Sequence, residues 1–246
     1  MTKFVAVLAC RVQSERLYAK PLQLVGGKPI LQHVIDRIKE QCKSIDEVIL
    51  AISENPENIP FETYAKEHNI KYVYGDENDV LGRLIKAGHA AEADVILRST
   101  TENPFIYVKT IDEMYKKHVE EKADISVCEE VPVGAYVEII TLKALEQSHA
   151  DGEDKHRSEL CTLYIKENPD KFKKLSYKVD EEIRRPEIRL TVDNPEDLIV
   201  VRKIWDAIGT QEGVIPLADI IKFLDENPEI KAINSGILAG TAKTWK

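Results

Sequence analysis

The run Phe4-Val-Ala-Val-Leu-Ala-Cys10, followed at once by Arg11-Val-Gln-Ser-Glu-Arg-Leu-Tyr-Ala-Lys20, is the most informative segment for the architecture of the chain. The first part is a continuous apolar run of strand length, which is typical of a strand buried on both faces of a parallel sheet. From Pro29 onward, apolar residues recur at helical spacing, and proline suits a first helical position because its missing N–H needs no partner there. These segments predict a central strand, a polar loop and a helix that packs on the sheet.

Strands and helices are expected to alternate through the first half of the chain. Further strands are predicted at 48–52, 71–74 and 95–97, and helices at 60–68, 79–91 and from after residue 106 to about 121. Such alternation indicates a largely parallel sheet built from right-handed crossovers.

The pattern changes after residue 121. Two strand candidates, 125–128 and 136–140, are separated by Pro132 and Gly134, which indicates a turn and antiparallel pairing. The polar stretch 147–157 predicts a mobile surface loop that is a candidate lid.

The last third of the chain completes the prediction. A further strand is expected at 188–192 and helices at 196–208 and 217–227, with no internal repeat and no linker rich in glycine and serine. We therefore expect one domain over 1–246, a three-layer, Rossmann-like α/β fold with a mixed, mainly parallel central sheet and a small antiparallel arm.

Composition excludes several classes of protein. The chain has 246 residues, 43% of them hydrophobic, and a formal net charge of -9, so it should form a sizeable core and should not bind nucleic acid outside a local basic patch. No apolar run reaches the about 20 residues that a membrane helix needs. The first residues lack a signal peptide, so a cytoplasmic location is expected. The four cysteines are far apart in the sequence and predict buried, reduced thiols rather than a zinc site.

The loop after the first strand is that local basic patch. It carries Arg11, Arg16 and Lys20 together with Ser14, where ligands of open α/β sheets bind. The first glycine after the strand is Gly26, so neither the dinucleotide-binding fingerprint nor a P-loop is present. The loop therefore predicts a polyphosphate site of another kind, the alternative being a merely solvated basic loop.

Longer motifs identify a family. The segment from Arg11 to His33-Val34 resembles the opening of the CMP-sugar cytidylyltransferases, which include acylneuraminate and 3-deoxy-manno-octulosonate cytidylyltransferases, and it is most similar to the spore coat polysaccharide biosynthesis protein F-like branch. The resemblance continues, in the family's order, through Gly75-Asp-Glu-Asn-Asp-Val-Leu81, Arg98-Ser-Thr-Thr-Glu-Asn-Pro104, Val137-Glu-Ile139 and Arg189-Leu-Thr-Val-Asp-Asn-Pro-Glu-Asp-Leu198. It implies a fold like that of the nucleotide-diphospho-sugar transferases.

The resemblance also implies roles for individual residues at the nucleotide. Arg11, Ser14, Arg16, Lys20 and Asp79 would bind CTP, and Arg16 and Lys20 would be catalytic by neutralising the departing pyrophosphate.

The same resemblance places Mg²⁺ at Glu102 and Asp193. The family usually has aspartate at the first of these positions, so Glu102 is alternatively a substrate contact. Asp193 is alternatively the N-cap of the following helix.

At the acceptor, the resemblance implies contacts from Arg98, Glu138 and Glu159, with an ion pair to Glu102 or Asp94 as the alternative for Arg98. Close relatives have Leu-Pro where this chain has Leu17-Tyr18, and a histidine where it has Leu160, so the acceptor is less certain than the nucleotide. His156 is either a replacement for that histidine or a solvated surface residue.

The predicted activity is transfer of CMP from CTP to an acidic small molecule, with release of pyrophosphate, for surface polysaccharide or capsule synthesis. The expected acceptor is an ulosonic acid sugar, and the alternative is a phosphorylated small molecule such as a phosphorylated amino acid amide. A non-catalytic nucleotide-binding protein and an oxidoreductase are the competing classes. We expect a homodimer with a dimerisation arm at about 125–140, and no membrane or nucleic acid partner.

Overall fold

The strand predicted at the start of the chain, β1 (Phe4–Cys10), lies in the interior of the main sheet. In the computed structural model, which describes residues 2–210 and 213–237, the sheet has seven strands in the order β5-β4-β1-β6-β8-β7-β9. The pairs on both sides of β1 are parallel, whereas β8 pairs antiparallel with both β6 and β7. The predicted mixed, mainly parallel sheet is therefore confirmed.

Up to α4, the strands of the main sheet and the α-helices follow the predicted alternation. The remaining strands are β2 (Leu24–Val25), β3 (Lys28–Pro29), β4 (Glu47–Ser53), β5 (Lys71–Gly75), β6 (Val95–Thr100), β7 (Ile125–Cys128), β8 (Glu138–Thr141) and β9 (Lys174–Tyr177). The α-helices are α1 (Ile30–Gln41), α2 (Ile59–Glu67), α3 (Val80–Ala90), α4 (Ile111–Glu120), α5 (Leu142–Asp151), α6 (Asp154–Arg157), α7 (Leu163–Glu167), α8 (Pro195–Ile208), α9 (Leu217–Glu226) and α10 (Pro228–Ser235). Short 3₁₀ helices occur at η1 (Lys20–Leu22), η2 (Pro56–Asn58) and η3 (Glu181–Ile183).

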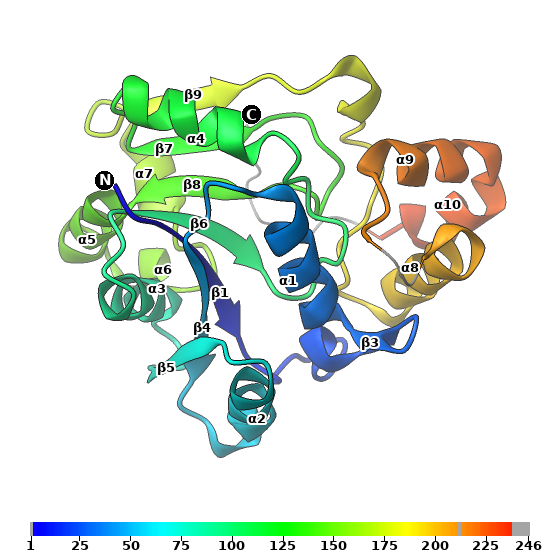
Figure 1. The fold of residues 1–246 in the computed structure, drawn as a ribbon, viewed down its shortest axis with the longest axis horizontal. Helices are drawn as coiled ribbons and strands as arrows, with labels where there is room; N and C mark the ends of the chain where they lie inside the picture. The colour runs from blue at the N-terminus through cyan, green and yellow to red at the C-terminus, as the bar shows by residue number, and fades with distance from the viewer. Residues whose placement is uncertain (1, 211–212, 238–246) are drawn as a thin grey trace.

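Helices cover both faces of the sheet, as the unbroken apolar run of β1 requires. Phe4, Leu8 and Cys10 pack with α1, α2 and α4, whereas Val5 and Val7 pack with α3, α5 and α7. Figure 1 shows the sheet between these layers, with α8, α9 and α10 gathered at one side of the molecule. Each fully buried leucine or isoleucine in these layers stabilises the fold by about 2 kcal/mol.

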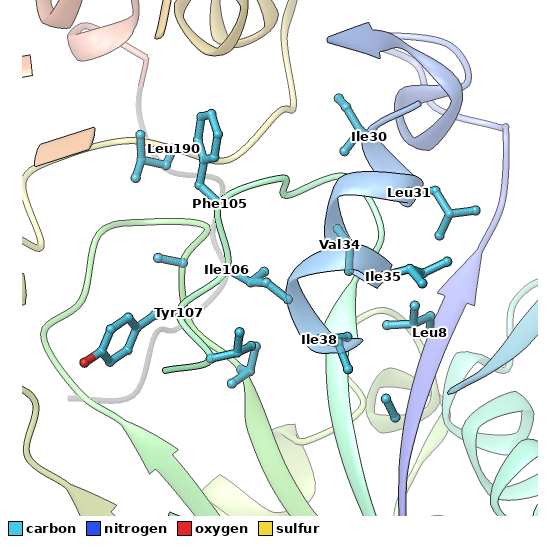
Figure 2. Packing of buried hydrophobic residues seen from close by; sticks show 14 of the residues in the cluster. Leu8, Ile30, Leu31, Val34, Ile35, Ile38, Phe105, Ile106, Tyr107 and Leu190 are labelled. Carbon is cyan, nitrogen blue, oxygen red and sulfur yellow. The ribbon is translucent and has the colours of Figure 1, made fainter. Parts of the chain in front are cut away.

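Helix α1 illustrates how local sequence and packing agree. Its N-cap is Pro29, and its buried face includes Leu31, Ile35 and Ile38. Figure 2 shows Ile35 and Ile38 beside Leu8 of β1, in the same apolar cluster. This packing fixes the loop between β1 and α1 against the edge of the sheet.

The strand register places polar residues at the edge where the parallel strands end. Val7 of β1 pairs with Arg98 of β6, and Arg98 pairs with Glu138 of β8. Residues paired across adjacent strands share one face, so the arginine and the glutamate lie side by side on the face covered by α3 and α5.

The structure corrects the predicted loop at 147–157, because α5 and α6 occupy most of it. Glu153 and His156 form a capping box, and His156 is buried against Tyr164. The predicted solvated surface histidine is therefore wrong, since this tertiary contact buries the ring and supports a short helix that polarity alone did not indicate.

The predicted strand at 188–192 is also wrong. Ile188, Leu190 and Val192 are buried as a strand pattern demands, but the segment makes a single parallel bridge, from Arg189 to Val133, in place of a ladder. The apolar side chains fill the core, whereas no neighbouring strand runs beside this backbone in the described part of the chain.

Two further predictions concern the second half of the chain. The antiparallel pairing of 125–128 with 136–140 is confirmed as β7 with β8, and the role of this region as a dimerisation arm stays a prediction. The sequence analysis did not predict β2, β3, α5, α6, α7, β9 or α10.

The four cysteines are free and buried, as predicted. Within residues 2–210 and 213–237, no helix has the length and apolar character needed to cross a membrane.

Candidate active site

A cleft of about 1080 Å³ opens at the carboxyl ends of β1 and β6. It collects every predicted site residue except Asp79: Arg11, Ser14, Arg16, Lys20, Arg98, Glu102, Glu138, Glu159 and Asp193 all line it. These residues come from segments far apart in the sequence, so the fold brings the predicted site together in one place.

Two hydrogen bonds hold the loop after β1 in shape. The backbone N–H of Val12 donates to the Asn58 side chain at 2.8 Å, and the N–H of Ala19 donates to the Val12 carbonyl at 2.8 Å. Ala19 adopts a left-handed conformation with φ of 51°, which turns the chain into η1. Together these contacts bring Arg11, Arg16 and Lys20 to the cleft.

The Asp193 carboxylate joins this loop to the distant segment before α8. Lys20 Nζ lies 2.8 Å and Arg16 Nη2 3.3 Å from its Oδ1 atom, and Arg189 Nη2 lies 3.3 Å from Oδ2. Burial by itself raises the pKa of Asp193, but Lys20, Arg16 and Arg189 outweigh burial and lower it below the usual value. The carboxylate is therefore ionised and surrounded by three cations.

Asp193 is not the helix N-cap. Asn194 is the N-cap of α8, and its side chain and that of Asp197 form the capping box. Asp197 also forms a buried ion pair with Arg189, whose Nε lies 2.8 Å from the carboxylate. Because Asn194 caps the helix, the Asp193 side chain is left to face the cleft.

Glu102 follows β6 and is half-buried. Burial raises the pKa of its carboxyl, Lys20 lowers it, and the nearby charge of Asp193 raises it further, for a net increase. Glu102 and Asp193 line the same cleft as Lys20, so two carboxylates face a common space beside a lysine. This donor set fits a hard divalent cation, which takes one or two carboxylates and completes its shell with phosphate oxygens and water.

A second polar cluster lies on the β6 and β8 side of the cleft. Arg98 Nη1 donates to Glu138 at 2.7 Å, its Nη2 donates to the Glu159 carbonyl at 3.2 Å, and Thr162 donates to Glu138 at 3.1 Å. Arg11 forms an ion pair with the exposed Glu159 carboxylate at 3.1 Å. The predicted alternative for Arg98, a pair with Glu102 or Asp94, is therefore wrong, because the register of β6 and β8 gives it Glu138.

Asp79 lies outside the residues that line the cleft. It caps α3 by accepting from the Gly82 N–H at 2.6 Å, and its other oxygen lies 2.6 Å from His149 Nε2. Its nucleotide-binding role stays a prediction, whereas its structural role as the N-cap is observed.

The sequence analysis missed several residues of the cleft. Arg83, Tyr136, Lys166 and Arg189 line it, and Asn58 shapes its loop from outside. Arg189 belongs to a motif that identified the family, but its role depends on Asp193 and Asp197. No local signal marks Arg83 or Lys166, because a basic residue in a helix usually lies on the solvated face.

Comparisons with known proteins identify the family of this chain. A family model described as "Cytidylyltransferase" matches residues 5–227. The chain belongs to the cytidylyltransferase family. Family membership makes the protein a CTP-dependent nucleotidyltransferase, so the predicted enzyme class is confirmed. The alternative prediction of an oxidoreductase is wrong.

Two curated relatives match almost the whole chain. An uncharacterised protein of Methanocaldococcus jannaschii is 31% identical over 238 residues, which is 96% of each chain. The spore coat polysaccharide biosynthesis protein SpsF of Bacillus subtilis is 25% identical over 233 residues, 93% of this chain and 97% of its own.

Solved structures confirm the fold of this cytidylyltransferase. A cytidylyltransferase from Leptospira borgpetersenii matches with a TM-score of 0.85 and 24% identity, covering 94% of this chain and 97% of its own. A CMP:2-keto-3-deoxy-manno-octonic acid synthetase complexed with CTP matches with a TM-score of 0.65 and 19% identity, covering 84% and 99% of the two chains.

The Arg98–Glu138 pair yields a prediction about stability. Glu138→Ala should lower the free energy of unfolding by about 3 kcal/mol, because it leaves a largely buried guanidinium without its carboxylate. The exposed ion pair between Arg11 and Glu159 is the control. Glu159→Ala should change the free energy of unfolding by less than about 1 kcal/mol. Urea unfolding of the two variants measures both values, and equal effects would contradict the assignment of a buried, structural ion pair.

Proposed function

We propose that this cytidylyltransferase moves CMP from CTP to an acidic small-molecule acceptor, for the synthesis of a surface polysaccharide or capsule. The main support for this proposal is that Arg16, Lys20 and Arg189 surround the Asp193 carboxylate in the cleft at the carboxyl end of β1. In the reaction, an acceptor oxygen forms a bond to the α-phosphorus of CTP, the bond from that phosphorus to the bridging oxygen breaks, and pyrophosphate leaves.

Arg16 and Lys20 are the proposed catalytic residues. They reach the cleft from one loop and share the Asp193 carboxylate. A triphosphate that enters the cleft would take over these cations, and the growing charge on the departing pyrophosphate would be neutralised by groups already in place. Arg11 and Ser14 line the same cleft and would complete the grip on the phosphates.

Glu102 and Asp193 would hold Mg²⁺. When bound, the ion would supply charge neutralisation at the phosphate oxygens. Asp193 would remain positioned by Arg189, which contacts Oδ2 and is itself held by Asp197. Metal binding would also lower the raised pKa of the half-buried Glu102. A cation beside this carboxyl favours its ionised form, which burial disfavours.

The acceptor would occupy the side of the cleft formed by β6 and β8. Arg98, Glu138 and Glu159 lie there, together with Lys166 and Tyr136. An ulosonic acid sugar is the proposed acceptor, supported by the 3-deoxy-manno-octulosonate cytidylyltransferase of Escherichia coli, which is 24% identical over 61% of this chain. Leu160, which lines the cleft in place of the histidine of close relatives, supports a phosphorylated small molecule as the alternative acceptor.

The test of this function separates the nucleotide from the acceptor. Thermal unfolding with CTP, UTP, ATP, GTP and NAD should show selective stabilisation by CTP with Mg²⁺, about 2.7 kcal/mol at 100 times the dissociation constant. Pyrophosphate release should then appear with an ulosonic acid sugar or with a phosphorylated amino acid amide. Stabilisation by CTP without pyrophosphate release from either acceptor class would favour the non-catalytic alternative, and no response to CTP would refute the proposal.

The proposed binding of the CTP phosphates by the loop after β1 predicts the effect of a substitution at Lys20. Lys20→Ala should slow pyrophosphate release about 10²- to 10³-fold, because it removes charge stabilisation that grows in the transition state. Lys28→Ala is the matched control, since Lys28 pairs with Asp36 at 3.5 Å and is not among the residues that line this cleft. Wild-type turnover of the Lys20 variant would remove Lys20 from the catalytic residues.

The proposed binding of Mg²⁺ by Asp193 predicts a change in the Mg²⁺ dependence of turnover. Asp193→Asn should raise the Mg²⁺ concentration at half-maximal turnover by at least about tenfold, because an amide is a weaker and uncharged ligand. Glu15→Gln, at an exposed carboxylate that lines the same cleft, should leave the Mg²⁺ titration unchanged. If both titrations match that of the wild type, Asp193 does not bind the metal.

A further inference from the structure

The side chain of Asn234, in helix α10, reaches into the interior of the protein. It is 3% exposed, and its Nδ2 atom donates to the Asp197 carboxylate at 2.9 Å and to the backbone carbonyl of Arg189 at 3.2 Å. Helix α10 packs against α8 and α9 at one side of the molecule (Figure 1). Because Asp193 lies between the two residues that accept these bonds, Asn234 fastens α10 to the segment that carries Asp193.

The segment 188–193 depends on side chains for its shape. Within residues 2–210 and 213–237, its backbone makes a single parallel bridge, between Arg189 and Val133. Two buried asparagines supply further hydrogen bonds: Asn103 accepts from an N–H of the segment at 3.4 Å, and Asn234 donates to a carbonyl of the segment. An asparagine side chain carries an amide donor and a carbonyl acceptor, so it can replace the peptide groups of a missing neighbouring strand.

Asp197 links Asn234 to Asp193. The Asp197 carboxylate is fully buried and accepts from the backbone N–H of Asp193 at 3.0 Å. Arg189 Nη2 donates both to this carboxylate, at 2.9 Å, and to Oδ2 of Asp193, at 3.3 Å. Asn234 shares the Oδ1 atom of Asp197 with Arg189 Nε. The amide of Asn234 therefore helps to fix both the backbone and the side chain of Asp193.

Helix α10 lies outside the part of the chain that the family model matches. The match covers residues 5–227, and α10 begins at Pro228. Arg189, Asp193 and Asp197 lie in the matched part, whereas Asn234 does not. The hydrogen bonds of Asn234 thus connect the matched part of the chain to a helix that follows it.

We propose that Asn234 is a positioning residue for CMP transfer, because by holding Asp197 and Arg189 it keeps the Asp193 carboxylate oriented toward the cleft. Asn234 is not among the residues that line the cleft, so it acts only through the residues that it holds. The inference rests on the proposed binding of Mg²⁺ by Asp193. Without the amide, Arg189 and Asp197 can shift together, and Asp193 loses the fixed orientation that a metal ligand needs.

The substitution Asn234→Leu tests the proposal, because leucine has a similar size and no donor. It should raise the Mg²⁺ concentration at half-maximal CTP binding about three- to tenfold, less than for a direct partner of a metal ligand, since Asn234 acts through Asp197. Asn234→Ser should shift this concentration in the same direction by less, because a hydroxyl has one hydrogen and can serve only one of the two acceptors. Isothermal titration with CTP at a series of Mg²⁺ concentrations measures these values without an acceptor.

Ile230→Ala is the matched control. Ile230 lies one turn before Asn234 in α10 and packs against the apolar core. Its truncation should lower the melting temperature, because it weakens the packing of α10, and should leave the Mg²⁺ dependence of CTP binding unchanged. This control separates the loss of the amide donor from a general loosening of the helix.

A double variant shows whether Asn234 acts through Asp193. In the Asp193→Asn background, Asn234→Leu should not raise the required Mg²⁺ concentration further. The effects of residues that act through one another are not additive, whereas those of independent residues add.

Each result has a definite meaning. A wild-type Mg²⁺ dependence in both Asn234 variants overturns the inference and leaves the proposed function intact. An equal shift in Ile230→Ala also overturns it, and so does an effect of Asn234→Leu that persists in full beside Asp193→Asn. If CTP binding by the wild type does not depend on Mg²⁺, or if Asp193→Asn keeps the wild-type dependence, the premise that Asp193 binds the metal is overturned together with the inference.

Discussion

The burial of β1 on both faces is the constraint on which the rest of the structure depends. Side chains of alternate residues enter two different apolar clusters, so helices must cover both sides of the sheet. A strand enclosed in this way can expose polar groups only at its ends. The loop that leaves its carboxyl end is therefore the one place near the centre of the sheet where cations can meet a solvated ligand, and the cleft lies there.

The electrostatics of the cleft differ from those of the whole chain. The formal net charge is -9, yet seven cationic and five acidic side chains line the cleft in the described residues. Asp193 is ionised and shares Lys20, Arg16 and Arg189, while Glu138 neutralises Arg98. In the proposed reaction, a triphosphate would meet an excess of positive charge that is already positioned, and this arrangement would reduce the reorganisation needed during phosphate transfer.

Two arginines that line the cleft, Arg98 and Arg83, differ in their partners. Arg98 and Glu138 satisfy one another across adjacent strands, so this pair supports the fold as well as one wall of the cleft. Arg83 is buried, and its Nε and Nη1 atoms have no hydrogen-bond partner among the described residues.

Local pattern was sufficient to predict several parts of this protein. The apolar run Phe4–Cys10, the helical spacing after Pro29 and the alternation up to α4 follow from periods of two and 3.6 residues. The basic loop was also predictable, because its residues are contiguous and follow a strand. Ordered motifs over most of the chain indicated the cytidylyltransferase family, which the comparison over residues 5–227 confirms.

Tertiary structure alone decided the contacts between distant segments. Lys20 and Asp193 are 173 residues apart, so no local pattern shows that they share an ion pair. The burial of His156 against Tyr164, the single bridge of Arg189 and the partner of Arg98 likewise depend on packing and register. Arg83 is the clearest case: a helical arginine is expected to be solvated, and only the assembled sheet, with Gly75 beneath its stem, encloses it at the cleft. Side-chain chemistry is local, whereas the presence or absence of a partner is a property of the whole fold.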